Sequence, residues 1–281
     1  MKSKKLLFTY AVAASVFFLA SCKKDNTSGS NDEIAVTTQS SQDMAISDNI
    51  SEDANNSFMA AASTNTLMGA RPEGVESPQT PFCGNVTVSQ GAFPKTITID
   101  FGTGSTCLDG ITRSGSINIV LSDSVRKSGS TATLTFNNYI VGGYKREGTI
   151  VWTNTRTGDA LSWTRVDSGK VTAPGGRYWY VTGTKNVVQT AGASTPLNIT
   201  DDVFSITGSR TYTNSNGVVR TATVVAGQPL EKATICANID KGQLKIQGPN
   251  HYVIIDFGDG TCDALATYAI DGGVAHQFIL R

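Results

Sequence analysis

The stretch that decides the fold occurs twice: residues 96–107 read TITIDFGTGSTC, and residues 252–262 read YVIIDFGDGTC. In both copies an alternating strand pattern runs into Ile-Asp-Phe-Gly-x-Gly and ends in Thr-Cys. A second cysteine precedes each copy in a Cys-x-Asn-aliphatic motif, at Cys83 and Cys236. The units 83–107 and 236–262 therefore form an internal repeat, which predicts two related strand-and-turn structures at the two ends of one domain.

Each unit has the residue types of a β-strand that ends in a glycine turn. Phe101 and Phe257 are expected in a hydrophobic core. The glycines that follow them permit positive backbone φ angles. Asp100 and Asp256 can accept hydrogen bonds from backbone amides within the turn.

The first 22 residues have the pattern of an export signal. Three lysines precede an apolar stretch that is too short to favour a membrane span. The segment Leu19-Ala20-Ser21-Cys22 resembles the lipobox of bacterial lipoproteins. This resemblance implies that signal peptidase II removes residues 1–21 and that Cys22 carries a diacylglyceryl group and an N-linked acyl chain such as palmitate. Lysine rather than aspartate follows Cys22, which resembles the pattern of lipoproteins sent to the outer membrane.

Residues 22–80 differ in composition from the rest of the chain. Ser, Asn, Asp, Thr and Ala dominate this segment, and Phe58 is its single aromatic residue. Such a segment is expected to bury too little apolar surface to offset its conformational entropy. We therefore predict a lipidated flexible linker over 22–80 and a folded β-domain over 81–281.

The charges of the chain nearly cancel, with 23 basic and 23 acidic residues, and removing residues 1–21 removes only three lysines. No basic field is left that would attract nucleic acid, so no nucleic-acid partner is expected. Charged residues make up only 16% of the chain, and 28 residues are glycine. This balance is typical of an exported β-protein with many turns.

The four cysteines of the repeat allow three disulfide pairings. We favour Cys83–Cys107 and Cys236–Cys262, because each unit then closes its own loop, and export brings the chain into an oxidising environment. A thiolate metal site is the alternative, although no Cys-x-x-Cys occurs.

Residues 113–230 read almost wholly as strands, with alternating runs at 116–121 and 218–224 broken by pairs such as Gly142-Gly143 and Asn216-Gly217. Alternation with such breaks favours antiparallel hairpins. No stretch of a dozen residues shows a clean helical period. The expected fold is all-β: an antiparallel sandwich, an open barrel or an extended twisted sheet.

Three tryptophans lie in this region. If Thr157-Gly158 is a two-residue loop, Trp152 lies opposite Trp163, whereas a longer loop would place Trp152 opposite Leu161. By alternation Trp179 faces away from its two tyrosine neighbours. Trp152 and Trp163 are expected either to pack in the sheet or to form a platform for a ligand such as a sugar.

Two resemblances concern the folded part. Residues 256–260, Asp-Phe-Gly-Asp-Gly, are similar to the turn of PKD-type β-sandwich modules, which bind surfaces or act as spacers. The whole pattern, with its motif at both ends of 81–281, resembles uncharacterised Gram-negative envelope lipoproteins. That resemblance implies no activity.

No catalytic motif stands out. The two histidines, His251 in a turn and His276 in a strand, lie outside any His-Glu-x-x-His pattern, and no Gly-x-Ser-x-Gly elbow occurs. The folded domain holds two glutamates, Glu147 and Glu231, and nothing pairs them with a second acid as a glycosidase requires. No catalytic residue and no cofactor are therefore predicted, and His251 is expected to be a solvated loop residue.

Calcium is the ion that the second glycine turn would suit. Asp256, Asp259 and Asp263 surround that turn, and carboxylates with turn carbonyls match a hard cation. The alternative is a plain acid-rich turn.

The sequence thus predicts a cell-envelope lipoprotein, held to the outer membrane by lipid on Cys22. A non-catalytic binding or scaffold role is the leading expectation, with a glycan or another envelope protein as the partner. The alternative is an envelope hydrolase that acts on polysaccharide.

Overall fold

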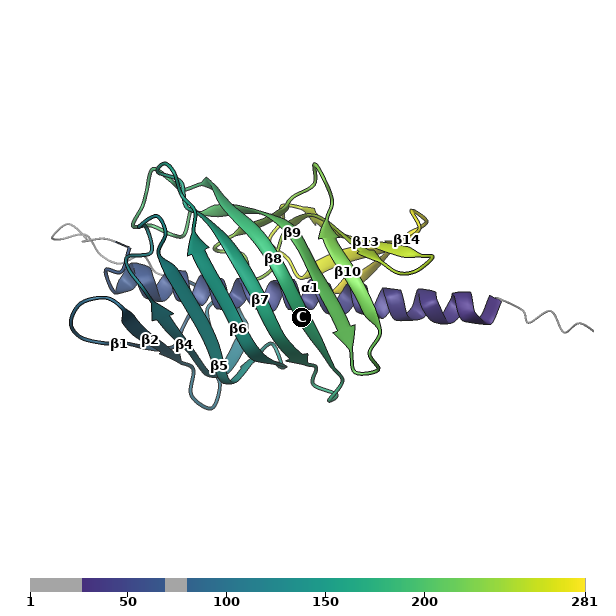
Figure 1. Ribbon diagram of the computed structural model, residues 1–281, viewed down its shortest axis with the longest axis horizontal. Coiled ribbons are helices and arrows are strands. Elements are labelled where there is room, and N and C mark those ends of the chain that lie inside the picture. The colour runs from purple at the N-terminus through teal and green to yellow at the C-terminus, as the bar shows by residue number, and fades with distance from the viewer. Residues whose placement is uncertain (1–26, 69–79, 281) are drawn as a thin grey trace, which may run out of the picture.

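The computed structural model of the protein describes residues 27–68 and 80–280. Within these ranges the chain forms one helix and fifteen strands (Figure 1). The elements are α1 (Thr27–Thr64), β1 (Asn85–Val88), β2 (Lys95–Asp100), β3 (Ser105–Thr106), β4 (Thr112–Leu121), β5 (Thr131–Val141), β6 (Tyr144–Asn154), β7 (Ser162–Thr172), β8 (Tyr178–Ala191), β9 (Val203–Asn214), β10 (Val219–Val224), β11 (Leu230–Ala233), β12 (Lys241–Gln247), β13 (Tyr252–Asp259), β14 (Leu265–Ile270) and β15 (Ala275–Ile279).

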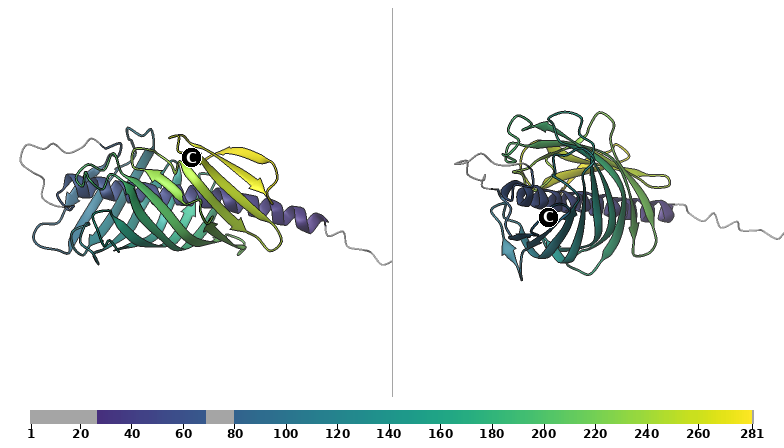
Figure 2. Two further views of the ribbon diagram at one scale, coloured as in Figure 1. Left: turned by 90° about the horizontal axis from the view of Figure 1, so that it is seen from above. Right: turned by 60° about the vertical axis from the view of Figure 1, so that its left-hand side comes forward.

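All fifteen strands belong to one sheet. The main path runs β1-β2-β4-β5-β6-β7-β8-β9-β10-β12-β13-β14-β15, with β3 beside β4, and β11 beside β9 and β12. Every strand pairing is antiparallel. The predicted antiparallel, sheet-rich fold is confirmed, in the form of one extended sheet that curves around α1 (Figure 2).

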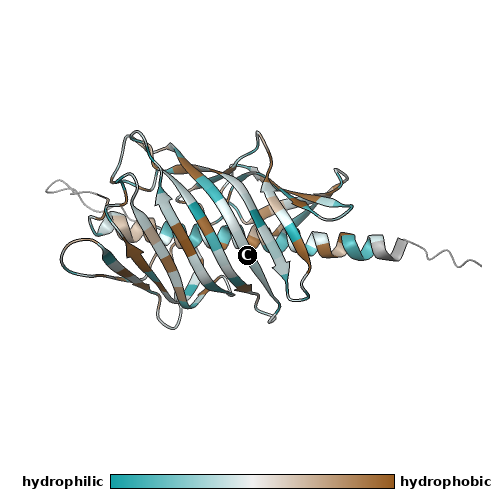
Figure 3. Cartoon of the chain, in the orientation of Figure 1, coloured by the Kyte–Doolittle hydropathy of each residue, from teal (hydrophilic) through white to brown (hydrophobic). Residues whose placement is uncertain are grey.

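Helix α1 lies inside the curve of this sheet. Every residue from Asp43 to Ser63 is buried, on all sides of the helix. Hydrophobic and hydrophilic positions alternate along the strands, and α1 carries hydrophilic positions along much of its length (Figure 3). Polar and apolar side chains are mixed around α1 rather than separated onto two faces, and such a helix is unstable when isolated, so its stability comes from the sheet that surrounds it.

The predicted flexible linker over 22–80 is therefore wrong for Thr27–Thr64. The prediction assumed that only apolar surface could order this segment. Helix α1 is ordered both by hydrogen bonds and ion pairs to the sheet and by apolar side chains that join the hydrophobic core, such as Met44, Ile50 and Phe58, whose ring centroid is 4.9 Å from that of Trp152. The predicted domain of 81–281 thus folds together with a segment that lies N-terminal to it.

The repeat behaves as predicted. Disulfides join Cys83 to Cys107 and Cys236 to Cys262. Phe101 and Phe257 are buried in the core. The turns are alike in detail: Asp100 Oδ1 accepts the N–H of Gly102 and Asp256 Oδ1 accepts the N–H of Gly258, both at 2.9 Å, and both glycines have positive φ angles.

The predicted register of the tryptophan hairpin is wrong. Trp152 lies opposite Arg165, not Trp163 or Leu161, and Trp163 lies opposite Asn154, because the hairpin is centred between Gly158 and Asp159 rather than on Thr157-Gly158. The two tryptophans are diagonal neighbours on the same face, which lets their rings stack at 4.7 Å with an interplanar angle of 6°. Trp179 is buried between two exposed tyrosines, as alternation predicted.

Candidate functional site

The most unusual feature of the molecule is a buried set of charges between α1 and the sheet. We call it the ionic core. Its members all have buried side chains: Asp43, Asp48, Glu52 and Asp53 of α1, and Arg113, Arg146, Arg165, Asp167, Lys185 and Arg210 of the strands. Charged side chains are seldom fully buried unless they are paired, so each of these groups needs its partner.

One end of the ionic core is built around Asp53. Its carboxylate accepts two hydrogen bonds from Arg113, at 3.0 Å from Nε and 2.5 Å from Nη2, and a third from the Tyr139 hydroxyl at 2.6 Å. Arg113 also contacts Asp109, which follows the first glycine turn. The repeat unit 83–107 and the C-terminal part of α1 are thereby tied together.

The centre of the ionic core is built around Asp167 of β7. Its Oδ2 accepts a hydrogen bond from Ser51 of α1 at 2.6 Å and forms a salt bridge with Arg210 at 3.0 Å, and its Oδ1 pairs with Arg146. Burial alone would raise the pKa of Asp167, but the attraction of Arg146 and Arg210 outweighs this effect and holds the pKa below its usual value. Asp167 is therefore ionised in the folded protein.

Asp48 and Glu52 complete the centre from the helix side. Asp48 Oδ1 is 2.9 Å from Arg210 Nη2, and Glu52 pairs with Arg165. Lys185 Nζ is 3.6 Å from Asp48 Oδ2 and makes no hydrogen bond with any described residue.

In the N-terminal part of the ionic core, α1 contacts neutral aromatic side chains as well as a charged one. Asp43 pairs with Arg177 and accepts a hydrogen bond from the Tyr212 hydroxyl at 2.8 Å. Burial nevertheless raises the pKa of Asp43 above its usual value. The Trp179 indole donates to Ser47 at 2.8 Å. Along α1 the partners therefore move from β8 and β9 to β7 and then to β4 and β5.

Positive charge is in excess at the centre. Four cations, Arg146, Arg165, Lys185 and Arg210, face three carboxylates, those of Asp48, Glu52 and Asp167. Lys185 is the group that can relieve this imbalance, because burial, only partly offset by Asp48, lowers its pKa to about 8.

Replacing Lys185 by methionine is expected to stabilise the protein. An unfolded lysine binds its proton up to a pKa of about 10.4, whereas folded Lys185 releases it near 8, so protonation costs the folded state about 3 kcal/mol below pH 8. Lys185→Met should raise the free energy of unfolding by up to that amount at pH 7. The gain should shrink as the pH rises from 8 to 10.5, because wild-type stability increases over that interval. Urea unfolding of both proteins at pH 7 and pH 10 measures this difference in the free energy of unfolding.

Lys127→Met, at an exposed position, is the matched control and should change stability little at either pH. A destabilised Lys185→Met variant at pH 7 would contradict the assignment of excess positive charge.

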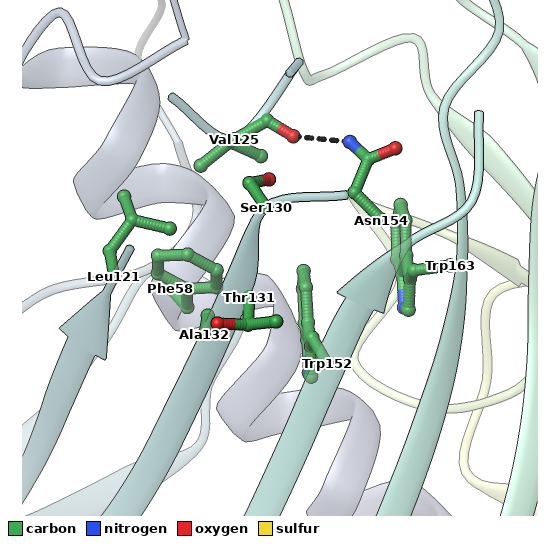
Figure 4. Close-up of a pocket in the computed structure, with 9 residues that line it drawn as sticks. All are labelled: Phe58, Leu121, Val125, Ser130, Thr131, Ala132, Trp152, Asn154 and Trp163. Carbon is green, nitrogen blue, oxygen red and sulfur yellow. Dashed lines mark hydrogen bonds between the residues drawn. The ribbon is translucent and has the colours of Figure 1, made fainter. Parts of the chain in front are cut away.

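The predicted ligand platform is not open in this structure. Trp152 and Trp163 are 4% and 3% exposed, and α1 covers them through Phe58. The cavity beside the stacked rings has a volume of about 10 Å³ and is closed by small and apolar side chains (Figure 4). Such a space holds at most one water molecule, so the pair acts in packing.

The predicted calcium ligands lie around one surface hollow but do not converge. Asp256, Asp259 and Asp263 line the hollow, yet each carboxylate accepts a backbone N–H of its own turn. Among the described Cys, His, Asp and Glu side chains, only those of Cys236, Asp240 and Cys262 place three ligand atoms within 4.8 Å of one another. The two cysteines are disulfide-bonded, so this group offers no thiolate.

The first repeat unit forms a comparable hollow. Asp100, Gly102 and Thr103 line it, as Asp256, Gly258 and Asp259 line the other. Their volumes are about 540 and 520 Å³, and both are lined by a mixture of polar and apolar groups. The two ends of the domain thus present similar open surfaces of mixed character.

The other residues that were considered as catalytic candidates, the two glutamates and the two histidines, do not form one common site. Glu147 is paired with Lys170 at 2.7 Å, and Glu231 with Lys241 at 3.2 Å, both on the partly exposed surface. His276 stacks on Tyr268 in the terminal hairpin. His251 was expected to be a solvated loop residue, and this prediction is wrong. Its ring lies between Ser30 of α1 and Asp271.

Sequence reasoning missed the acids of α1 and Ser30. One signal was present: inward positions of neighbouring strands carry basic residues, as at Arg146, Arg165 and Lys185. Those cations need buried anions, and the acid-rich segment before the domain could supply them.

Cys22 and the whole of 1–26 lie outside the described residues. Within 27–68 and 80–280, no helix has the length and apolar character needed to cross a membrane. No family model matches the chain, and neither a curated protein nor a solved structure is detectably similar to it.

Proposed function

We propose that the protein is a lipid-anchored cell-envelope protein that binds or scaffolds other envelope components. The observation that carries this proposal is the position of α1. The structure describes this helix from Thr27, five residues after Cys22 in the sequence. Ser30 and Glu33 already contact the turn before β13, so the anchor leads into a helix that is fixed to the domain.

A helix that is fixed to the sheet gives the domain a defined orientation relative to its anchor. The N-terminal end of α1 lies near β13 and β14, and its C-terminal end lies near β2 (Figure 1). The end of the domain that contains the second repeat unit would therefore face the membrane, and the end that contains the first would face away from it.

The open hollows of the two repeat units are the surfaces that would bind. Asp, Thr and Asn side chains beside glycine turns offer hydrogen bonds of the kind that a glycan or a peptide backbone uses. The inner face of the sheet is not available to such a partner, because α1 occupies it.

A polysaccharide hydrolase is supported less well. Glu147 and Glu231 are bound to lysines on the surface rather than set beside an aspartate in a cleft. The salt bridges to Lys170 and Lys145 also hold the pKa of Glu147 below its usual value, whereas a general acid needs a raised one.

Replacing Cys22 by alanine is expected to release the protein from the membrane fraction, because the acyl chains supply the membrane affinity. The measurement is fractionation of cells that express the full chain, followed by immunoblotting. Ser21→Ala keeps a small residue before Cys22 and should leave the protein in the membrane fraction.

A Cys22→Ala protein that still sediments with membranes would contradict the anchor. The released protein also serves as bait for envelope polysaccharide and envelope protein fractions. If the bait retains neither polysaccharide nor protein from these fractions, the binding role is contradicted.

A further inference from the structure

A Ser–His–Asp relay lies at the N-terminal end of α1. Ser30 Oγ is 2.9 Å from His251 Nε2, and His251 Nδ1 is 2.6 Å from Asp271 Oδ2. The three residues come from the first turn of α1, the turn before β13 and the turn between β14 and β15. They are far apart in sequence and are brought together only by the packing of α1 against the sheet.

The order of partners fixes the direction of proton transfer. Asp271 accepts the Nδ1–H of His251, which leaves Nε2 able to accept the proton of the Ser30 hydroxyl. The pKa of Asp271 lies below its usual value, chiefly because Oδ1 accepts the N–H of Tyr252 and also because of His251. Asp271 therefore stays ionised, as an orienting carboxylate must.

The backbone holds both the imidazole and the carboxylate in place. Asp271 has a φ of 50°, an uncommon conformation outside glycine, and its N–H donates to the carbonyl of Tyr252 at 3.0 Å. On the helix side, Glu33 accepts the N–H of Asn250 at 2.7 Å and of His251 at 3.0 Å. Chiefly through the bond with the Asn250 N–H, these contacts lower the pKa of Glu33 to about 2.

The relay is open to a substrate. The side chains of His251 and Asp271 are 23% and 40% exposed.

We propose that Ser30, His251 and Asp271 form a nucleophilic site for acyl transfer from carboxylic esters. Ser30 Oγ bonds to the ester carbonyl carbon while His251 Nε2 takes the hydroxyl proton. The ester C–O bond then breaks, and His251 gives the proton to the departing alkoxide, which leaves as the alcohol. Water attacks the acyl-serine with His251 as the base, and the carboxylic acid and free Ser30 are formed.

The position of the relay points to esters at a membrane surface. Ser30 follows Cys22 by eight residues. This part of the inference rests on the proposed lipid anchor. The nucleophilic site itself does not, so soluble and membrane-bound forms of the protein test the two separately.

The test is labelling of the full chain with a fluorophosphonate probe, followed by peptide mass spectrometry, together with hydrolysis of p-nitrophenyl butyrate. We expect the label on Ser30 and none in Ser30→Ala. His251→Gln should slow both reactions by on the order of 10³-fold, because the base is lost. The Cys22→Ala protein should retain both reactions even though it has left the membrane.

Three matched variants serve as controls: Ser215→Ala at an exposed turn, His276→Gln and Asp159→Asn should react as the wild type does. Ser30→Cys distinguishes a nucleophile from a merely structural hydroxyl, since its alkylation by iodoacetamide should be faster with His251 present than with His251→Gln. A wild-type protein that takes no label at Ser30, or a His251→Gln variant that reacts at the wild-type rate, would overturn the proposal.

Discussion

Asp167→Asn is expected to lower the free energy of unfolding by about 3–5 kcal/mol, the usual cost of removing one partner from a buried charge pair. The substitution keeps the shape of the side chain and removes its charge. Arg146 and Arg210 would then share Asp48 and Glu52 with Arg165 and Lys185, so that four buried cations would face two anions. The amide would also direct N–H groups toward a guanidinium or the Ser51 hydroxyl.

Chemical unfolding at several pH values measures this effect. The pKa of Asp167 is lowered in the folded protein, so its contribution is present above its unfolded pKa of about 3.9 and is lost as the pH falls below that value. The destabilisation by Asp167→Asn should therefore be largest near neutral pH and should shrink in acid.

Two variants accompany the measurement. Asp159→Asn, whose side chain is 99% exposed, should change stability by less than about 0.5 kcal/mol. Asp167→Asn combined with Lys185→Met should recover part of the loss, because both residues act on one charge balance. An Asp167→Asn protein as stable as the wild type would mean that the ionic core does not hold α1.

The sheet could be predicted from the sequence because its signals are local. Alternation, glycine pairs and the Ile-Asp-Phe-Gly-x-Gly repeat each depend on residues close in the chain, and the disulfides follow from the repeat. The register of the β6–β7 hairpin could not be predicted, because the seven residues between Asn154 and Ser162 admit several loop lengths.

Helix α1 could not be predicted for a different reason. Its residues have low helix propensity and little apolar surface, and their partners lie some 60 to 220 residues later in the chain. The relay of Ser30, His251 and Asp271 is hidden by the same fact, since Ser30 is placed only by the packing of α1. Complementary charges, basic at inward strand positions and acidic in 43–53, were the only trace of this contact in the sequence.

Ala54→Pro is expected to destabilise the protein strongly. The variant distinguishes between two descriptions of residues 43–63, an enclosed helix and a flexible linker. Ala54 is fully buried near the middle of the enclosed part of α1. Proline there removes one helical hydrogen bond and clashes with the preceding turn, at a cost of ~3 kcal/mol or more. The bend would also move Asp43 and Asp48 relative to Asp53, so ion pairs on one side of it would be lost.

The measurement is thermal unfolding combined with limited proteolysis. In the wild type, residues 43–63 should resist cleavage, because the sheet covers them on every side. In Ala54→Pro the same segment should become a cleavage site and the unfolding midpoint should fall. Asp32→Ala, at an exposed position of the same helix, is the control and should leave both the midpoint and the cleavage pattern unchanged. Equal midpoints for the wild type and Ala54→Pro would show that α1 is not part of the folded core. The ionic core and the Ser30 relay would then be contradicted as well, because both require α1 to pack against the sheet.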